Sequence, residues 1–197
     1  MPQFLESICL VDGQAPLLEL HQQRVTDTFR HHFPSNKILD LATLIPPVSR
    51  PKTKQKVRIV YNGISSKVEL SEYRQRPLKK LKLIEAPSDL DYGFKYTDRS
   101  ELEDLFDLRA DADEIIISKN DMVTDSFYAN LAFWRNDEWV TPKSCLLNGV
   151  RRQHLLSTGQ IKEINIEVTS LPDFDKVCLI NAMLDLGDSE VSIQMID

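Results

Sequence analysis

The sequence has no apolar stretch that approaches the length needed to cross a membrane, and it has no internal repeat or low-complexity segment. Its first residues contain Glu6 and Asp12 and lack the basic start that precedes the apolar core of a signal peptide. These absences disfavour a membrane-spanning protein, a repeat protein and a secreted precursor. We therefore expect a soluble protein of the cytoplasm.

Cysteine is scarce, and its spacing is uninformative for metal binding. The three cysteines, Cys9, Cys145 and Cys178, lie far apart and form no Cys-x-x-Cys pair. This arrangement predicts reduced thiols rather than a disulfide framework or a zinc site. We expect no bound metal.

An excess of positive charge is also missing. The chain has 24 basic and 30 acidic residues and a formal net charge of −6, which disfavours nucleic acid as the main partner. Two local basic runs, residues 50–58 and 74–82, alternate with other residues, as a solvated strand face or loop does. We interpret both as solvated, with attraction of an anionic substrate as the alternative.

Helical and strand patterns alternate along the chain, which is typical of an α+β protein. Pro87-Ser88-Asp89 indicates a linker between an N-terminal lobe, residues 1–86, and a C-terminal lobe, residues 90–197. The patterns predict helices over residues 16–33, 37–44, 101–108 and 150–157, and strands over residues 4–10, 56–63, 67–73, 81–86, 113–118, 130–134, 139–141, 161–168, 177–181 and 191–196.

Lys95 suggests a chemistry through its neighbours. Tyr92, Phe94 and Tyr96 flank it, and aromatic side chains that exclude water lower the pKa of a lysine amine. A lysine with a lowered pKa can form a Schiff base with a carbonyl group. The alternative is a solvated surface lysine.

Asp125 and Asn130 lie in the next polar segment, Thr-Asp-Ser-Phe-Tyr-Ala-Asn. A carboxylate that faces the pyridine nitrogen of pyridoxal phosphate keeps this nitrogen protonated, so that the ring withdraws electrons from the substrate. Asn130 could orient a ring or substrate oxygen. The alternatives are a turn or N-cap aspartate and a turn asparagine.

A predicted helix begins at Val150, directly after Gly149, and Arg151 lies in its first turn. Backbone amides at a helix start can bind a phosphate, and glycine permits close approach. Arg24, on the first predicted helix with His21 one turn before it, could hold a phosphate through two hydrogen bonds. The alternatives are a glycine turn before a helix and a surface arginine.

The order of these segments resembles the fold-type IV pyridoxal-phosphate enzymes, also called class IV aminotransferases. The opening Phe-Leu-Glu-Ser, followed by a helix with a His-x-x-Arg pair, is similar to the family's start, and the resemblance implies that Arg24 binds the phosphate. Lys95, with Arg99 one turn later, is similar to the family's lysine segment. It would be the Schiff-base lysine and the general acid–base group.

Two later segments extend the resemblance. Thr-Asp-Ser-Phe-Tyr-Ala-Asn is similar to the family's Thr-Glu-x-x-x-x-Asn element, which makes Asp125 the partner of the pyridine nitrogen, with Asn130 beside it. Leu-Leu-Asn-Gly-Val-Arg-Arg is similar to the turn at Gly149 whose next amides, Val150 and Arg151, bind phosphate.

Ile-Asn-Ala-Met-Leu resembles the late loop that completes the phosphate site, with Asn181 and Ala182 as the expected contacts. The sequence departs from the family in having Asp125 in place of glutamate, in a slightly compressed spacing before Gly149, and in starting without the family's N-terminal hairpin.

The resemblance implies a two-lobed fold with an N-terminal α/β lobe, a C-terminal barrel-like lobe that carries Lys95, and the cofactor in a cleft between the lobes. It also implies a homodimer and a small amino substrate.

We favour an aminodeoxychorismate lyase, which releases pyruvate from 4-amino-4-deoxychorismate to give 4-aminobenzoate, because the Asn181-Ala182 pair looks like the lyase branch. The alternatives are an aminotransferase for branched-chain or D-amino acids, a non-catalytic binding module of the same fold, and a small-ligand-binding protein without cofactor.

Overall fold

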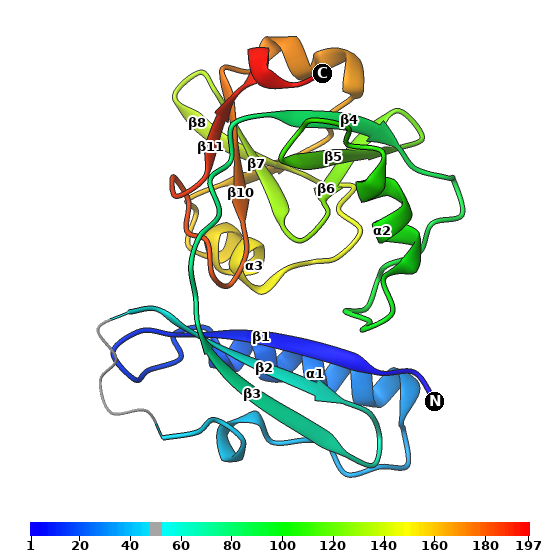
Figure 1. Cartoon of the computed structure of the whole chain (residues 1–197), viewed down its shortest axis with the longest axis vertical. Coiled ribbons are helices and arrows are strands. Elements are labelled where there is room, and N and C mark those ends of the chain that lie inside the picture. The colour runs from blue at the N-terminus through cyan, green and yellow to red at the C-terminus, as the bar shows by residue number, and fades with distance from the viewer. Residues whose placement is uncertain (48–52) are drawn as a thin grey trace. The chain divides into compact units, whose positions relative to one another are not determined.

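The computed structural model describes residues 1–47 and 53–197 and shows a mixed α+β chain, as predicted. The chain forms two compact units: Met1–Gln75 with Phe94–Asp98, and Arg76–Gly93 with Arg99–Asp197 (Figure 1). The sequence suggested one division near residue 86, whereas the contacts group residues 76–93 with the second unit and Lys95 with the first. Residues 50–52 of the first basic run lie outside the described residues.

A three-stranded antiparallel sheet and one long helix form the first unit. The strands β1 (Phe4–Leu10), β2 (Gln55–Tyr61) and β3 (Ser66–Glu72) are paired in the order β1-β2-β3, and the helix α1 (Leu18–His32) lies along one face of them (Figure 1). A turn that contains Asn62 and Gly63 joins β2 to β3. Asn62 Oδ1 stabilises it by accepting hydrogen bonds from two backbone amides of the turn, each at 2.8 Å.

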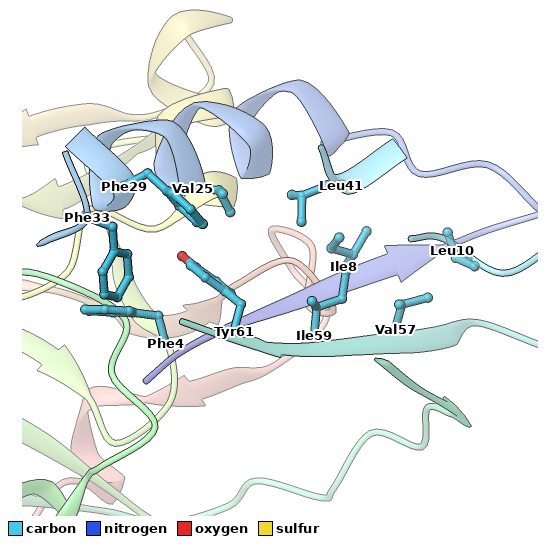
Figure 2. Close-up of a cluster of buried hydrophobic side chains, with 10 residues drawn as sticks. All are labelled: Phe4, Ile8, Leu10, Val25, Phe29, Phe33, Leu41, Val57, Ile59 and Tyr61. Carbon is cyan, nitrogen blue, oxygen red and sulfur yellow. The ribbon is translucent and has the colours of Figure 1, made fainter. Parts of the chain in front are cut away.

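The core of the first unit lies between α1 and the sheet (Figure 2). Buried residues alternate along β1 and β2 because successive side chains of a strand point to opposite faces. The same alternation places Glu6, between Phe4 and Ile8, in the buried row, where it has no exposed surface. The core side chains are Phe4, Ile8, Leu10, Val25, Phe29, Phe33, Leu41, Val57, Ile59 and Tyr61.

The segment that contains Lys95 pairs with β1. Leu5 N donates to Lys95 O at 2.9 Å, Thr97 N donates to Gln3 O at 2.9 Å, and a β-bridge joins Phe4 to Tyr96. These backbone contacts explain why a segment so late in the chain belongs to the first unit.

An eight-stranded sheet forms the body of the second unit, with the order β11-β10-β7-β6-β5-β4 and with β8 paired to β7 and β9. The pairs β4–β5 and β8–β9 are parallel, and the other pairs are antiparallel. The strands are β4 (Leu81–Glu85), β5 (Glu114–Lys119), β6 (Met122–Ser126), β7 (Asn130–Arg135), β8 (Glu138–Pro142), β9 (Lys162–Ile164), β10 (Lys176–Ile180) and β11 (Glu190–Ser192).

Two short helices pack on this sheet. The helix α2 (Ser100–Asp107) buries Leu102 and Leu105 against isoleucines of β4 and β5, and α3 (Val150–Ser157) buries Leu155 against residues of β7 and β10. The packing of α3 brings its first turn close to β7. Within the described residues, no helix is both long and apolar enough to cross a membrane.

Tight turns fix the strands that carry the candidate site. Asn120 and Asp121, between β5 and β6, have φ of 53° and 62°, and Asn136 and Asp137, between β7 and β8, have φ of 51° and 61°. Asparagine and aspartate tolerate this left-handed conformation better than other side chains do. Between these two turns, β6 and β7 are paired with Asp125 opposite Asn130.

Three predicted elements are shorter in the structure because side chains and prolines interrupt the pattern. Residues 37–44 form only the 3₁₀ turn η1 (Leu41–Thr43), in which the Asp40 side chain caps Ala42 N. The predicted strand over residues 161–168 is reduced to β9 and leads into η2 (Val168–Asp173), which contains Pro172. The last predicted strand ends at Ser192, whose side chain caps η3 (Ile193–Met195).

Candidate active site

The first unit contains a buried ionic cluster of Glu6 on β1 with His21 and Arg24 on α1. Arg24 Nε donates to Glu6 Oε1 at 2.8 Å and Arg24 Nη2 donates to Glu6 Oε2 at 2.5 Å. His21 Nδ1 lies 2.5 Å from Glu6 Oε2. Because His21 and Arg24 are three residues apart on a helix, both project toward the same carboxylate. The arginine predicted to bind phosphate is therefore oriented by Glu6.

The cluster sets the protonation states of its members. Burial raises the pKa of Glu6, but the charge and hydrogen bonds of Arg24, together with His21, outweigh burial and lower this pKa to about 2. Burial lowers the pKa of His21, Glu6 opposes this effect, and the charges of Arg24 and Lys95 add to it. Glu6 is therefore ionised and His21 neutral at pH 7. In the described part of the chain, the buried His21 Nε2 has no hydrogen-bond partner.

Lys95 is half-buried and lies on a segment that aromatic contacts hold in the first unit. The ring centres of Tyr96 and Phe4 are 5.0 Å apart, and those of Phe94 and His32 are 4.6 Å apart. Tyr92, which we also expected beside the amine, packs against the apolar cluster of α2 and β5 in the second unit. Of the three aromatic neighbours of Lys95 in the sequence, Phe94 and Tyr96 belong to the same unit as Lys95.

Asp125, at the end of β6, is buried and accepts three hydrogen bonds from neutral donors. Asn130 Nδ2 donates to its Oδ1 at 2.7 Å, and the backbone amides of Leu146 and Leu147 donate to its Oδ2 at 2.9 and 3.0 Å. Burial raises the pKa of Asp125 to about 6, although these hydrogen bonds and the charge of Arg152 lower it. Asp125 is thus a buried carboxylate whose hydrogen-bond donors among the described residues are all neutral.

Asn130 connects Asp125 to the start of α3. Its Nδ2 also donates to Leu147 O at 2.7 Å, and its Oδ1 accepts from Gly149 N at 3.1 Å. A Cβ atom at Gly149 would lie 2.1 Å from Asn130 Oδ1, so only glycine allows this approach. Both Asn130 and Gly149 were predicted as site residues, and the position of the Asn130 side chain requires glycine at residue 149.

Val150 and Arg151 occupy the first turn of α3, where backbone amides have no partner within the helix. Val150 is buried, and Arg151 Nη1 forms an ion pair with Asp185 Oδ1 at 2.6 Å. The next residue, Arg152, was not among the predicted site residues; it is buried and donates hydrogen bonds to Asn148 Oδ1, Pro142 O and Glu163. Arg152 therefore holds α3 to β8 and β9.

Asn181 and Ala182 form a tight turn after β10. Asn181 Oδ1 accepts from the amides of Met183 and Leu184 at 2.8 and 3.1 Å, and Asn181 Nδ2 donates to Tyr128 O at 3.4 Å. Tyr128 belongs to the turn between Asp125 and Asn130. The late loop is therefore tied to the same part of the second unit as the predicted carboxylate.

The structure thus brings Asp125, Asn130 and Gly149 into one hydrogen-bonded chain in the second unit. Val150 and Arg151 follow Gly149 directly, and Asn181 is linked to the turn between Asp125 and Asn130 through Tyr128 O. In the first unit the structure joins Arg24 to Glu6 and His21 and places Lys95 within electrostatic reach of His21. The sequence analysis gave Glu6 no role. Its position between two buried apolar residues of a strand was the signal that could have identified it.

Pyridoxal phosphate fits the donor set of the second unit. Asp125 Oδ1 accepts one hydrogen bond, from Asn130 Nδ2, and a carboxylate oxygen can accept a second, so a protonated pyridine nitrogen would be a suitable charged donor for this buried group. The amides that open α3 suit a phosphate group. Within the described residues, no group of three or more potential metal ligands gathers.

Two facts define the class of this protein: a two-unit α+β fold, and a buried carboxylate tied to a glycine at a helix start. The sequence matches the amino-transferase class IV family over residues 3–187. The chain belongs to this family, whose members are pyridoxal-phosphate-dependent enzymes, and its fold is that of fold type IV.

Individual relatives agree with this membership. A Haemophilus influenzae protein is 33% identical over 186 residues, which cover 93% of this chain and 98% of the relative. A crystal structure from Haemophilus somnus, provisionally named a 4-amino-4-deoxychorismate lyase, is 30% identical with a TM-score of 0.89 and covers 94% of this chain and 98% of its own. A Brucella abortus aminotransferase bound to pyridoxal phosphate is 16% identical with a TM-score of 0.77, covers 99% of this chain and 81% of its own, and shares the fold.

Proposed function

We propose that the protein binds pyridoxal 5′-phosphate and releases pyruvate from 4-amino-4-deoxychorismate, leaving 4-aminobenzoate. The observation that carries the cofactor assignment is Asp125, a buried carboxylate that accepts only neutral hydrogen-bond donors among the described side chains and amides. The reaction is supported by the similarity to the Haemophilus somnus protein over nearly the full length of both chains.

The proposal assigns Lys95 as the point of covalent attachment and as the acid–base group. Asp125 would bind the pyridine nitrogen, and Arg24 would bind the phosphate with the guanidinium that Glu6 orients. The remaining proposed cofactor contacts are Asn130, Gly149, Val150, Arg151, Asn181 and Ala182.

When bound, the cofactor supplies an electron-withdrawing ring that stabilises negative charge on the carbon bearing the substrate amine. The Lys95 amine would remove the proton from that carbon. The bond between the neighbouring ring carbon and the enolpyruvyl oxygen then breaks, the ring becomes aromatic, and the leaving enol is protonated to pyruvate. Substrate atoms are thereby divided between 4-aminobenzoate and pyruvate, and no second substrate is needed.

Asp125 would hold the pyridine nitrogen in its protonated form. A carboxylate in a site of low polarity interacts strongly with a positive partner, because little water screens the pair. Such a partner would lower the pKa of Asp125 from about 6, since an adjacent positive charge favours the ionised form.

Amine transfer between two amino acids is the second candidate, because the matched family is described as amino-transferase class IV. The same Lys95 would then move a proton at the substrate α-carbon, and a keto acid would be required to complete the cycle. The two candidates therefore differ in their need for a second substrate.

Pyruvate release measured with and without an added keto acid tests the reaction. Purified protein loaded with pyridoxal phosphate is expected to form pyruvate and 4-aminobenzoate in equal amounts from 4-amino-4-deoxychorismate alone. Product formation that requires a keto acid would establish the aminotransferase instead. Cofactor binding without either reaction would favour a non-catalytic binding module.

The family resemblance also leads us to propose a homodimer. Light scattering during size-exclusion chromatography is expected to give about twice the mass of 22.7 kDa calculated for one chain. A mass equal to that of one chain would overturn this part of the proposal.

A further inference from the structure

Phe127 lies in the turn that joins Asp125 to Asn130. The turn is closed by Ser126 N, which donates to Ala129 O at 2.8 Å, and by Ser126 Oγ, which contacts Ala129 N and Ala129 O at 3.1 Å. Because it connects the two residues at the end of the β6–β7 pair, its conformation governs how Asn130 meets Asp125.

Glu114, at the start of β5, holds the amide of Phe127. Its Oε1 accepts from Phe127 N at 3.0 Å and from Ile115 N at 2.9 Å, and the residue is 1% exposed. A buried backbone N–H without an acceptor is costly, so this contact fixes the turn.

Arg99, at the start of α2, holds the carbonyl of the same residue. Arg99 Nη2 donates to Phe127 O, and the guanidinium carbon lies 4.1 Å from the centre of the Phe127 ring. The Phe127 ring stacks on Phe106 with centres 4.4 Å apart, and the guanidinium of Arg109 lies 4.0 Å from the Phe106 ring. The backbone donor and the backbone acceptor of Phe127 are thus both held by side chains from other elements.

We propose that Glu114 and Arg99 are positioning residues for the cofactor: by holding both backbone groups of Phe127, they fix Asn130 against Asp125 and Gly149. This inference rests on the proposed function. Neither side chain is among the proposed cofactor contacts, and each acts through the turn.

The charged groups that face Glu114 are Arg99 and Arg109. Burial raises the pKa of Glu114 to about 7, so the neutral carboxyl is a normal state of this residue near neutral pH. Glu114→Gln should therefore keep the acceptor for Phe127 N and preserve the position of the turn. Glu114→Leu removes the acceptor at a similar size.

The test compares three variants, Glu114→Leu, Glu114→Gln and Arg99→Met, with the control Arg109→Met. Arg109 also stacks on an aromatic ring, but its guanidinium donates to Phe106 O and not to Phe127 O. Two readouts are measured: the pyridoxal phosphate dissociation constant by absorbance titration, and the exchange rate of the Asn130 side-chain amide by NMR in cofactor-free protein. Melting temperatures record overall stability.

Glu114→Leu and Arg99→Met are expected to weaken cofactor binding and to speed Asn130 exchange by at least about tenfold each, because a buried backbone group loses its partner. Glu114→Gln and Arg109→Met are expected to remain within about threefold of the wild type. Rescue by glutamine separates positioning from a general loss of stability.

Wild-type exchange rates at Asn130 in both damaging variants would overturn the inference, as would equal losses in all four variants. If Glu114→Leu fails to fold, Arg99→Lys, which keeps the charge but loses the planar stacking group, replaces it with the same expected direction. A wild-type protein that binds no pyridoxal phosphate would overturn the proposed function, while the exchange rates in cofactor-free protein would still decide whether the two side chains position Asn130.

Discussion

The fully buried Glu6 makes the first unit sensitive to acid. Its pKa is about 2 in the folded chain against an ordinary value of 4.5, so the ionised form is stabilised by folding. This contribution to folding stability is present above pH 4.5 and is lost as the pH falls toward 2. The difference between the ordinary and the folded pKa of Glu6 corresponds to roughly 3 kcal/mol of unfolding free energy.

Glu6→Gln is expected to lower the unfolding free energy at pH 7 by about 3 kcal/mol or more, because Arg24 and His21 lose their charged partner. The variant should also lose less stability than the wild type between pH 5 and 3. Urea unfolding followed by circular dichroism measures both effects. Glu69→Gln, on the exposed edge strand β3, is the control and should change little. Equal acid sensitivity in Glu6→Gln and wild type would contradict the assignment.

Glycine is required at position 149 by a close contact and not by the backbone angles. Its φ of −67° and ψ of 148° suit any residue, but an added Cβ would overlap Asn130 Oδ1. Gly149→Ala is therefore expected to lower stability by about 1–3 kcal/mol and to weaken pyridoxal phosphate binding at least about tenfold. Thermal unfolding and cofactor titration measure these effects.

Gly93→Ala is the matched control for Gly149→Ala. The nearest atom to a Cβ at Gly93 is Asp91 Oδ1 at 3.4 Å, which is an ordinary contact. Cofactor affinity that is unchanged in Gly149→Ala would show that the start of α3 does not contribute to the site.

At the scale of elements, the segment of residues 94–98 depends on aromatic packing to stay on β1. Tyr96→Ala removes the ring that lies 5.0 Å from Phe4, so the backbone pairing of Leu5 N and Thr97 N should open more often. Hydrogen exchange at these two amides is expected to accelerate at least about tenfold. Tyr92→Ala, whose ring packs in the second unit, should leave them unchanged. Equal exchange rates in both variants would contradict this role of Tyr96.

The elements that the sequence predicted well are those with local signals. Strand patterns over residues 56–63 and 67–73 predicted the two strands of the β2–β3 hairpin, and the helical pattern over residues 16–33 indicated the first helix. The pairing of residues 94–98 with β1 could not be predicted, because a strand edge shows no preference in the sequence for a partner so distant in the chain. The 3₁₀ turns were missed because a side-chain cap such as that of Ser192 competes with a strand pattern that looks continuous.

At the scale of the whole molecule, two buried carboxyls oppose stability at neutral pH. Asp125 has a pKa of about 6 and Glu114 of about 7, against ordinary values of 3.8 and 4.5. A carboxyl with a raised pKa contributes stability below its unfolded value and loses it as the pH rises through the folded value. The cofactor-free protein should therefore become less stable between pH 4.5 and 7.

Glu114→Gln should reduce this loss by roughly 3 kcal/mol, because glutamine does not ionise. Urea unfolding of cofactor-free wild type and variant at pH 5 and 8 measures the difference. The same pH dependence in both proteins would show that Glu114 titrates at its ordinary pKa.

The candidate site could be predicted only in part. Residue types and their order indicated Asp125, Asn130 and Gly149 together, and the structure joins them by hydrogen bonds. The alternation of β1 could have indicated that Glu6 is buried, but one sequence does not show which arginine of another element a buried carboxylate meets, and Glu114 was missed for the same reason. The assignment of Lys95 as the reactive amine stays a prediction.

The most direct test of the central claim is the visible absorption spectrum of the purified protein with pyridoxal phosphate, before and after borohydride reduction. Lys95→Ala is the variant, and Lys37→Ala, at an exposed position of the first unit, is the control. We predict a yellow species in the wild type and in Lys37→Ala, with reduction fixing the cofactor on the peptide that contains Lys95. No such species in the wild type, or the same species in Lys95→Ala, would contradict the account.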